Sequence, residues 1–134
     1  MNIRNANRWL PLASLALLAT PLTLLAHHGT AGTYDQKKLV KVTGVVKEFR
    51  WRNPHCALLL TGKDAAGAEV TYSFEIGSPN SLVRRGFNRD AFKVGDTVSL
   101  EYHPAFNNPN VGNPESKTFV VNGKPLTGMG ESNE

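Results

Sequence analysis

Apolar and polar residues alternate along several stretches of the chain, and this alternation predicts β-strands. Residues 70–76 and residues 97–103 alternate most regularly, as strands that bury one face do. Residues 56–62 are apolar at successive positions, which is typical of a strand that is covered on both sides. The side chains that we expect to face the core are Val70, Tyr72, Phe74, Ile76, Val98, Leu100 and Tyr102.

The longest predicted strand, residues 40–51, changes its phase part of the way along. Val42 lies on one face, whereas Phe49 and Trp51 continue on the other. We place the change at Gly44, because a glycine at such a point indicates a bulge or a sharp bend.

One short helix is predicted after the third strand. Ser78 is a suitable N-cap, Pro79 suits the first helical position, and Gly86 is a natural stop, which leaves about two turns. Asn88 can cap a second short turn that ends at Phe92.

The last third of the chain is less regular. Residues 105–116 are dense in Asn, Pro and Gly and predict a loop. Residues 117–126 predict a short closing strand with a hairpin turn at Asn122 and Gly123. We expect residues 128–134 to form a disordered tail.

The order of these elements predicts an all-β fold. Three strands, a short helix and two more strands are the layout of a small five-stranded Greek-key barrel of the OB type. A curved first strand with a glycine in it fits such a barrel. The barrel occupies residues 40–127, and an open five-stranded sandwich is the alternative.

Residues 1–26 have the pattern of a secretory signal peptide. Arg4 and Arg8 precede an uncharged stretch, residues 9–26, which is mostly Leu and Ala. It ends in the small residue Ala26, which is the expected cleavage point. We therefore expect a periplasmic protein with an extended arm over residues 27–39.

A retained membrane helix is the alternative to a cleaved signal peptide. The apolar run is just long enough to span a bilayer. Pro11 and Pro21 argue against a span, because proline weakens a helix. We expect contact with a membrane only if this segment is retained.

Composition and charge fit one domain that is stabilised by an apolar core. The chain has 134 residues and a net charge of +4, and Arg4 and Arg8 leave with the signal peptide. The remaining excess is too small for the basic face that nucleic-acid binding needs, so we expect no nucleic-acid partner. Cys56 is the single cysteine, which excludes an internal disulfide.

The four histidines suggest a metal site. Cleavage after Ala26 makes His27 the first residue, so that its α-amino nitrogen and ring nitrogen can chelate one ion. The amine has an ordinary pKa of about 7.7–8.0, and a divalent metal can displace its proton near neutrality. One more imidazole completes a nitrogen-rich, T-shaped set that favours Cu(II). The arrangement is analogous to the histidine brace of exported copper proteins.

His55 is the preferred third ligand. Pro54 stiffens its approach and Asn53 can fix the turn, while His28 and His103 are the next candidates. The predicted role is sequestration or delivery of copper, because nothing in the sequence supplies a general acid or base beside the metal.

Two other interpretations remain open for these histidines. A terminus at Ala26 gives Ala-His-His, whose amine, amides and third-position imidazole also bind Cu(II) or Ni(II). Alternatively, His27 and His28 are polar residues that the peptidase tolerates, and His55 bonds to backbone within a structural turn.

No motif of an enzyme is present. The sequence has no GxSxG, Walker loop or HExxH pattern. Cys56 follows His55, but neighbours in a strand point to opposite faces, so His55 is badly placed to act as its base. We expect Cys56 to be buried.

A cluster of arginines marks the end of the predicted helix. Arg84, Arg85 and Arg89 flank Gly86, where the helix dipole favours cations. These arginines can be a solvated helix end. The competing function is a metal-free periplasmic module that binds a protein partner or ligand through the corner formed by Arg84, Arg85 and Phe87.

Four segments of the chain resemble a known family: AHHGTAGTYD, VTGVVKEFRWRNPH, GSPNSLVRRGFNRDAFKVGDTV and NGKPL. The family comprises small exported bacterial proteins with a domain of unknown function. The resemblance implies a periplasmic location and a small β domain, and it implies no activity. At Phe87 the family more often has Trp, and it has no fixed histidine at His103. The matching positions are His27, His28, Asn53, Pro54, His55, Arg84, Arg85, Gly86 and Phe87.

Overall fold

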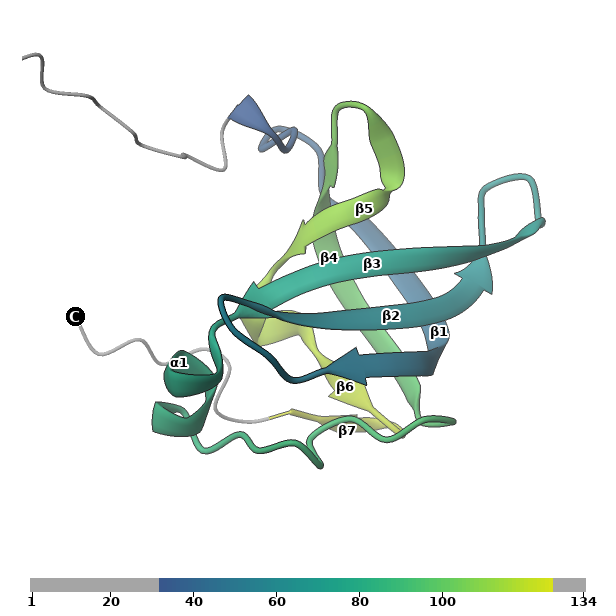
Figure 1. Ribbon diagram of the computed structural model, residues 1–134. Helices are drawn as coiled ribbons and strands as arrows, with labels where there is room; N and C mark the ends of the chain where they lie inside the picture. The colour runs from purple at the N-terminus through teal and green to yellow at the C-terminus, as the bar shows by residue number, and fades with distance from the viewer. Residues whose placement is uncertain (1–31, 127–134) are drawn as a thin grey trace, which may run out of the picture.

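Five strands with apolar inner faces close into a β-barrel in the computed structural model, which describes residues 32–126 (Figure 1). A short α-helix follows the third strand, and a small hairpin follows the fifth. The strands are β1 (Val40–Arg50), β2 (Cys56–Lys63), β3 (Glu69–Gly77), β4 (Thr97–Ala105), β5 (Asn108–Pro114), β6 (Val120–Val121) and β7 (Lys124–Pro125). The helices are α1 (Pro79–Arg84) and a 3-10 turn, η2 (Ser116–Thr118).

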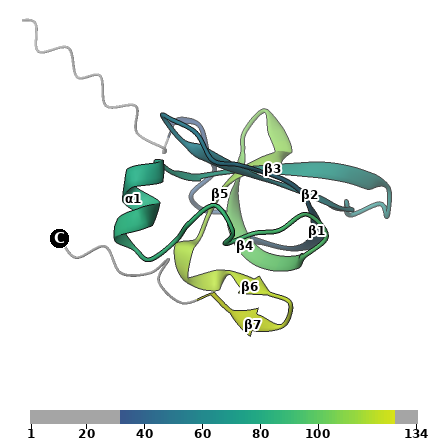
Figure 2. The same cartoon turned by 60° about the horizontal axis from the view of Figure 1, so that its bottom comes forward.

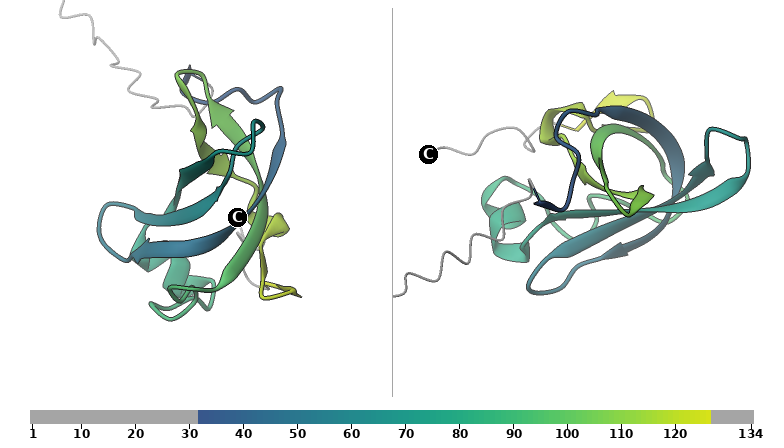
Figure 3. Two further views of the ribbon diagram at one scale, coloured as in Figure 1. Left: turned by 90° about the vertical axis from the view of Figure 1, so that its right-hand side faces the viewer. Right: turned by 90° about the horizontal axis from the view of Figure 1, so that it is seen from above.

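The strand order confirms the predicted barrel. The sheet runs β1-β2-β3-β5-β4, and β4 pairs again with β1, which closes the ring (Figure 3). All pairings in the ring are antiparallel except β3 with β5. The fold is all-β, of the OB type, with α1 between β3 and β4, and the open sandwich is excluded. Figure 2 shows α1 at one end of the barrel.

Most of the side chains that alternation placed inside belong to the core, but Val70 is only partly buried and packs against its edge. Tyr72, Phe74 and Ile76 of β3 are buried, as are the inner residues of β4. Phe74 packs edge-on against Tyr102 of β4, with ring centroids 5.0 Å apart. The largest fully buried side chains are Phe74, Phe119, Leu58, Leu60, Leu82, Leu100, Val46, Val98 and Cys56.

Strand β1 does change its phase, but the predicted position of the change is wrong. The pairing with β2 slips between Val46 and Glu48, so the bulge lies at Lys47. Gly44 has another role, since it pairs with both β2 and β4. A Cβ atom there would lie 2.7 Å from the carbonyl oxygen of Thr61, so only glycine allows these strands to approach so closely.

The prediction of a loop over residues 105–116 is wrong, because β5 forms within it. The inner position of this strand is Gly112, and the ring of Tyr102 from β4 covers it. The Tyr102 hydroxyl also donates to the carbonyl of Pro109 at the start of β5. A neighbouring strand thus supplies the apolar side chain, and β5 shows no alternation of its own.

The predicted turns and caps are confirmed. Ser78 Oγ accepts from the Ser81 amide at 3.2 Å, Pro79 opens α1, and Gly86 follows it with φ of 84°. Asn122 and Gly123 have φ of 49° and 79°, as a two-residue hairpin requires. This hairpin, β6–β7, extends the sheet from β4 instead of closing the barrel.

Residues 32–39, which we call the arm, run along the end of β4. Tyr34 forms a bridge with Ala105, and the Asp35 amide donates to the Pro104 carbonyl at 2.8 Å. Within the described range no helix has the length and apolar character needed to cross a membrane. The predicted signal peptide, His27, His28 and the predicted tail over residues 128–134 lie outside the described residues.

Replacement of Gly112 by alanine is expected to lower the free energy of unfolding by about 2 kcal/mol. The added Cβ would overlap the ring of Tyr102, a residue that is 2% exposed, so this ring would have to shift. Urea denaturation measures the change. The control is Gly32→Ala, whose Cβ would meet nothing within 4 Å, and an equal loss in both variants would contradict the expectation.

Candidate metal-binding site

The described residues contain two of the four histidines, His55 and His103. No three His, Cys, Asp or Glu side chains between residues 32 and 126 gather into a group that could hold a metal ion. A site on this part of the chain would therefore need ligands from elsewhere. The two rings differ in their surroundings, and this difference decides which of them can serve as a ligand.

His55 ends the turn between β1 and β2. Its ring is about half exposed, and the peptide bond between Asn53 and Pro54 is cis. The Nδ1 atom lies 2.6 Å from Oε1 of Glu75, an outward-facing residue of β3. A carboxylate accepts, so Nδ1 carries the proton and donates to it. In the neutral ring, Nε2 is then left with a lone pair.

The pair borders a pocket of about 200 Å³. The pocket lies just beyond the place where β3 and β5 pair, on the side of their C-terminal ends. The residues that line it besides His55 and Glu75 are Ile76, Gly77, Asn113, Pro114 and Ser116.

The arm passes close to this pair. Burial and the negative charge of Glu75 raise the pKa of the Tyr34 hydroxyl, which lies within the electrostatic reach of Glu75. His27 is five positions before Gly32 in the sequence. An extended chain spans about 17 Å over that length.

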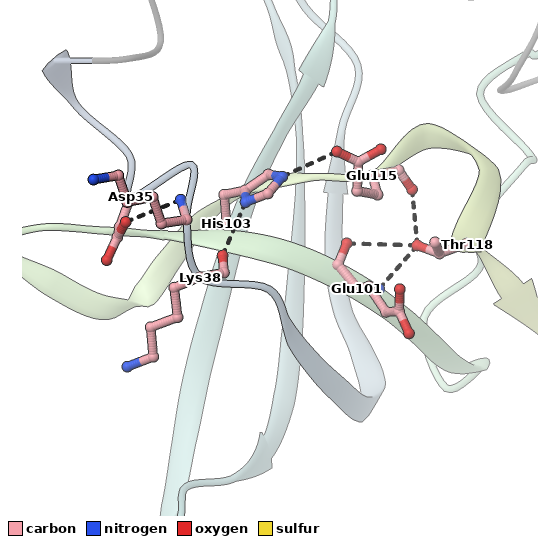
Figure 4. Close-up of polar contacts among 7 residues, drawn as sticks. Asp35, Lys38, Glu101, His103, Glu115 and Thr118 are labelled. Carbon is pink, nitrogen blue, oxygen red and sulfur yellow. Dashed lines mark hydrogen bonds and ion pairs between the residues drawn. The ribbon is translucent and has the colours of Figure 1, made fainter.

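His103 has no free ring nitrogen. Its Nδ1 lies 2.9 Å from the carbonyl oxygen of Lys38 in the arm, and its Nε2 lies 3.0 Å from Oε1 of Glu115 (Figure 4). The side chain is 13% exposed. A metal ion could bind this ring only by displacing one of these partners, so His103 is a poor candidate for a ligand.

Cys56 is buried, as expected, with no exposed surface. Burial raises the pKa of its thiol, an effect that a hydrogen bond with the backbone of Arg52 partly offsets. The thiolate is therefore disfavoured, whereas the neighbouring His55 ring faces outward. The structure offers no activated cysteine here.

The arginine corner is largely part of the fold. Phe87 is 7% exposed and belongs to the core. The Arg85 side chain donates to the hydroxyl and carbonyl oxygens of Ser81. Arg84 and Val83 are exposed. Partner binding at this corner remains a prediction that would depend mainly on these two residues.

Sequence reasoning missed Glu75, Tyr34 and Glu115. Alternation did place Glu75 on the outer face of its strand, yet the pairing of His55 with it depends on the register of β2 with β3. That register is irregular between Cys56 and Ala57, so no spacing rule would have found the pair.

The comparison with known proteins identifies the family of the chain and gives no activity. A family model described as a family of unknown function (DUF6152) matches residues 14–113. No curated protein matches the chain. The matched range includes the arm, β1 to β4 and most of β5, and therefore both candidate histidines of the barrel.

The contact with Glu75 predicts the tautomer of His55. In the neutral ring we expect the proton on Nδ1 and a bare Nε2, because Nδ1 faces the Glu75 carboxylate. ¹⁵N NMR of the ring distinguishes the two tautomers. Glu75→Ala should abolish the preference, whereas Glu69→Ala, at the exposed start of the same strand, should keep it. A protonated Nε2 in the native chain would contradict this geometry.

Proposed function

The chain belongs to the DUF6152 family, whose function is unknown, and we propose that this member is an exported periplasmic protein that binds one copper ion. Its role is to sequester or deliver the metal. The ligands are the α-amino and ring nitrogens of His27, once the signal peptide has been removed after Ala26, and Nε2 of His55.

The contact between His55 and Glu75 is the observation that supports this proposal most strongly. Histidines that bind metals almost always donate their other ring N–H to a carboxylate, a carbonyl or water. Such a bond holds the ring in one orientation and makes the free nitrogen a better donor. His55 has this arrangement, with Nδ1 on Glu75 and about half of the side chain exposed.

The other two nitrogens come from His27, which precedes the arm in the sequence. Tyr34 lies near Glu75, and the chain before it has the length to bring His27 towards the same end of the barrel. Three nitrogens from one amine and two imidazoles favour Cu(II), which also has the highest affinity among the divalent metals of the first row. His28 is adjacent to His27 and is the alternative ligand.

The proposal predicts that His55→Ala lowers Cu(II) affinity at least tenfold, and that Glu75→Ala lowers it by about tenfold or more. Titration of the mature chain, released without a tag and followed by electron paramagnetic resonance, measures both effects. Arg52→Ala is the matched control from the turn of His55, and Glu69→Ala is the control from the strand of Glu75. Equal affinities for His55→Ala and the native chain would remove His55 from the site.

The amine of His27 has its own test. Acetylation of the N-terminus leaves every side chain in place, and we expect it to weaken binding as strongly as His55→Ala does. Mass spectrometry of the exported chain shows whether His27 is the first residue. A different terminus, or no affinity for Cu(II) in the micromolar range, would overturn the proposed function.

A further inference from the structure

We propose that His103 is a positioning residue that clamps the arm to the barrel and so directs His27 towards the side that carries His55. This inference rests on the proposed function as far as His27 is concerned. The clamp itself concerns only residues that the structure describes, and it can be tested without a metal.

The arm meets the barrel through a small number of contacts. The Asp35 amide donates to the Pro104 carbonyl, and the Phe106 amide donates to the Thr33 carbonyl at 3.1 Å. The bond between the His103 ring and the Lys38 carbonyl is the side-chain contact that ties the arm to β4. His103 and Pro104 are neighbours, so the clamp and the backbone bonds act on one short length of the arm.

The two partners of the ring require it to be charged. A carbonyl oxygen and a carboxylate both accept hydrogen bonds, and a neutral imidazole can donate only one. Nδ1 and Nε2 can therefore satisfy the Lys38 carbonyl and the Glu115 carboxylate together only as an imidazolium. Loss of the proton turns one of these contacts into a repulsion between lone pairs.

Glu115 is held in place for this contact. Its amide donates to the Glu101 carbonyl at 2.8 Å, and its own carbonyl accepts from the Thr118 hydroxyl at 2.8 Å (Figure 4). The charged groups around the ring are Asp35 and Lys38 from the arm, Glu115 after β5, and Glu101 on β4.

The strength of the clamp depends on pH. Burial lowers the pKa of His103, but the hydrogen bonds to the Lys38 backbone and to Glu115, together with the charge of Glu115 and the backbone of Asp35, raise it above the ordinary 6.5. When folding raises the pKa of a group, that group stabilises the folded state fully at any pH below the pKa it has in the unfolded chain. The stabilisation is lost as the pH rises through the pKa that the group has in the folded chain. The clamp is therefore strongest in acid.

Amide hydrogen exchange on the metal-free chain tests the clamp. The probes are the amides of Asp35 and Phe106, which donate across the contact between arm and barrel. At about pH 6 we expect His103→Gln and Glu115→Gln to lower their protection factors roughly tenfold. Glu101→Gln, on the same strand, is the control and should change nothing.

A merely structural histidine would give a different result. If His103 acts as a clamp, the difference in protection factor between the native chain and His103→Gln becomes smaller at about pH 9, where the native ring is also neutral. Equal protection factors in the native chain and His103→Gln at pH 6 overturn the clamp. A difference between them that does not change with pH overturns it as well. Glu115 is exposed, so Glu115→Gln still provides the test if His103→Gln does not fold.

Copper titration of the same variants tests the effect on the site. We expect His103→Gln to bind Cu(II) several-fold more weakly at about pH 6 than the native chain, although both proposed ligands are intact. Equal affinities overturn the positioning role and leave the copper site standing. A native chain that binds no copper overturns the proposed function and the guidance of His27, whereas hydrogen exchange still decides the clamp.

Discussion

The parallel pairing of β3 with β5 is the constraint on which the rest of the structure depends. Only two residue pairs join these strands in parallel, Ser73 with Val111 and Phe74 with Gly112. At Gly112 the Tyr102 ring lies where a side chain of β5 would otherwise be, so this position of the ladder requires a glycine. The ladder ends beside the pocket of His55 and Glu75, and this pairing therefore sets the walls of the candidate site.

Most of the fold was predictable because its signals are local. Alternation identified β3 and β4, and the caps at Ser78 and Gly86 placed α1. Strand β5 could not be predicted in the same way, because the apolar group over its inner face belongs to Tyr102 of another strand. The bulge at Lys47 was placed three residues too early, since Gly44 serves close packing between strands.

The candidate site was predictable only in part. Residue type and turn position were sufficient to select His55, but its partner Glu75 is 20 positions away and is reached through a sheet register. His103 was placed among the candidate ligands because it precedes Pro104 at the end of a predicted strand. Its partner in the arm is 65 residues distant, so the occupation of both its nitrogens becomes visible only in three dimensions.

The two histidines show how surroundings divide the roles of one residue type. Glu75 engages one nitrogen of His55 and leaves the other available, whereas Lys38 and Glu115 engage both nitrogens of His103. Protons act on these two arrangements in opposite directions. Under the proposed function a metal ion would need an unprotonated nitrogen on His55, whereas the two contacts of His103 need a proton on each ring nitrogen.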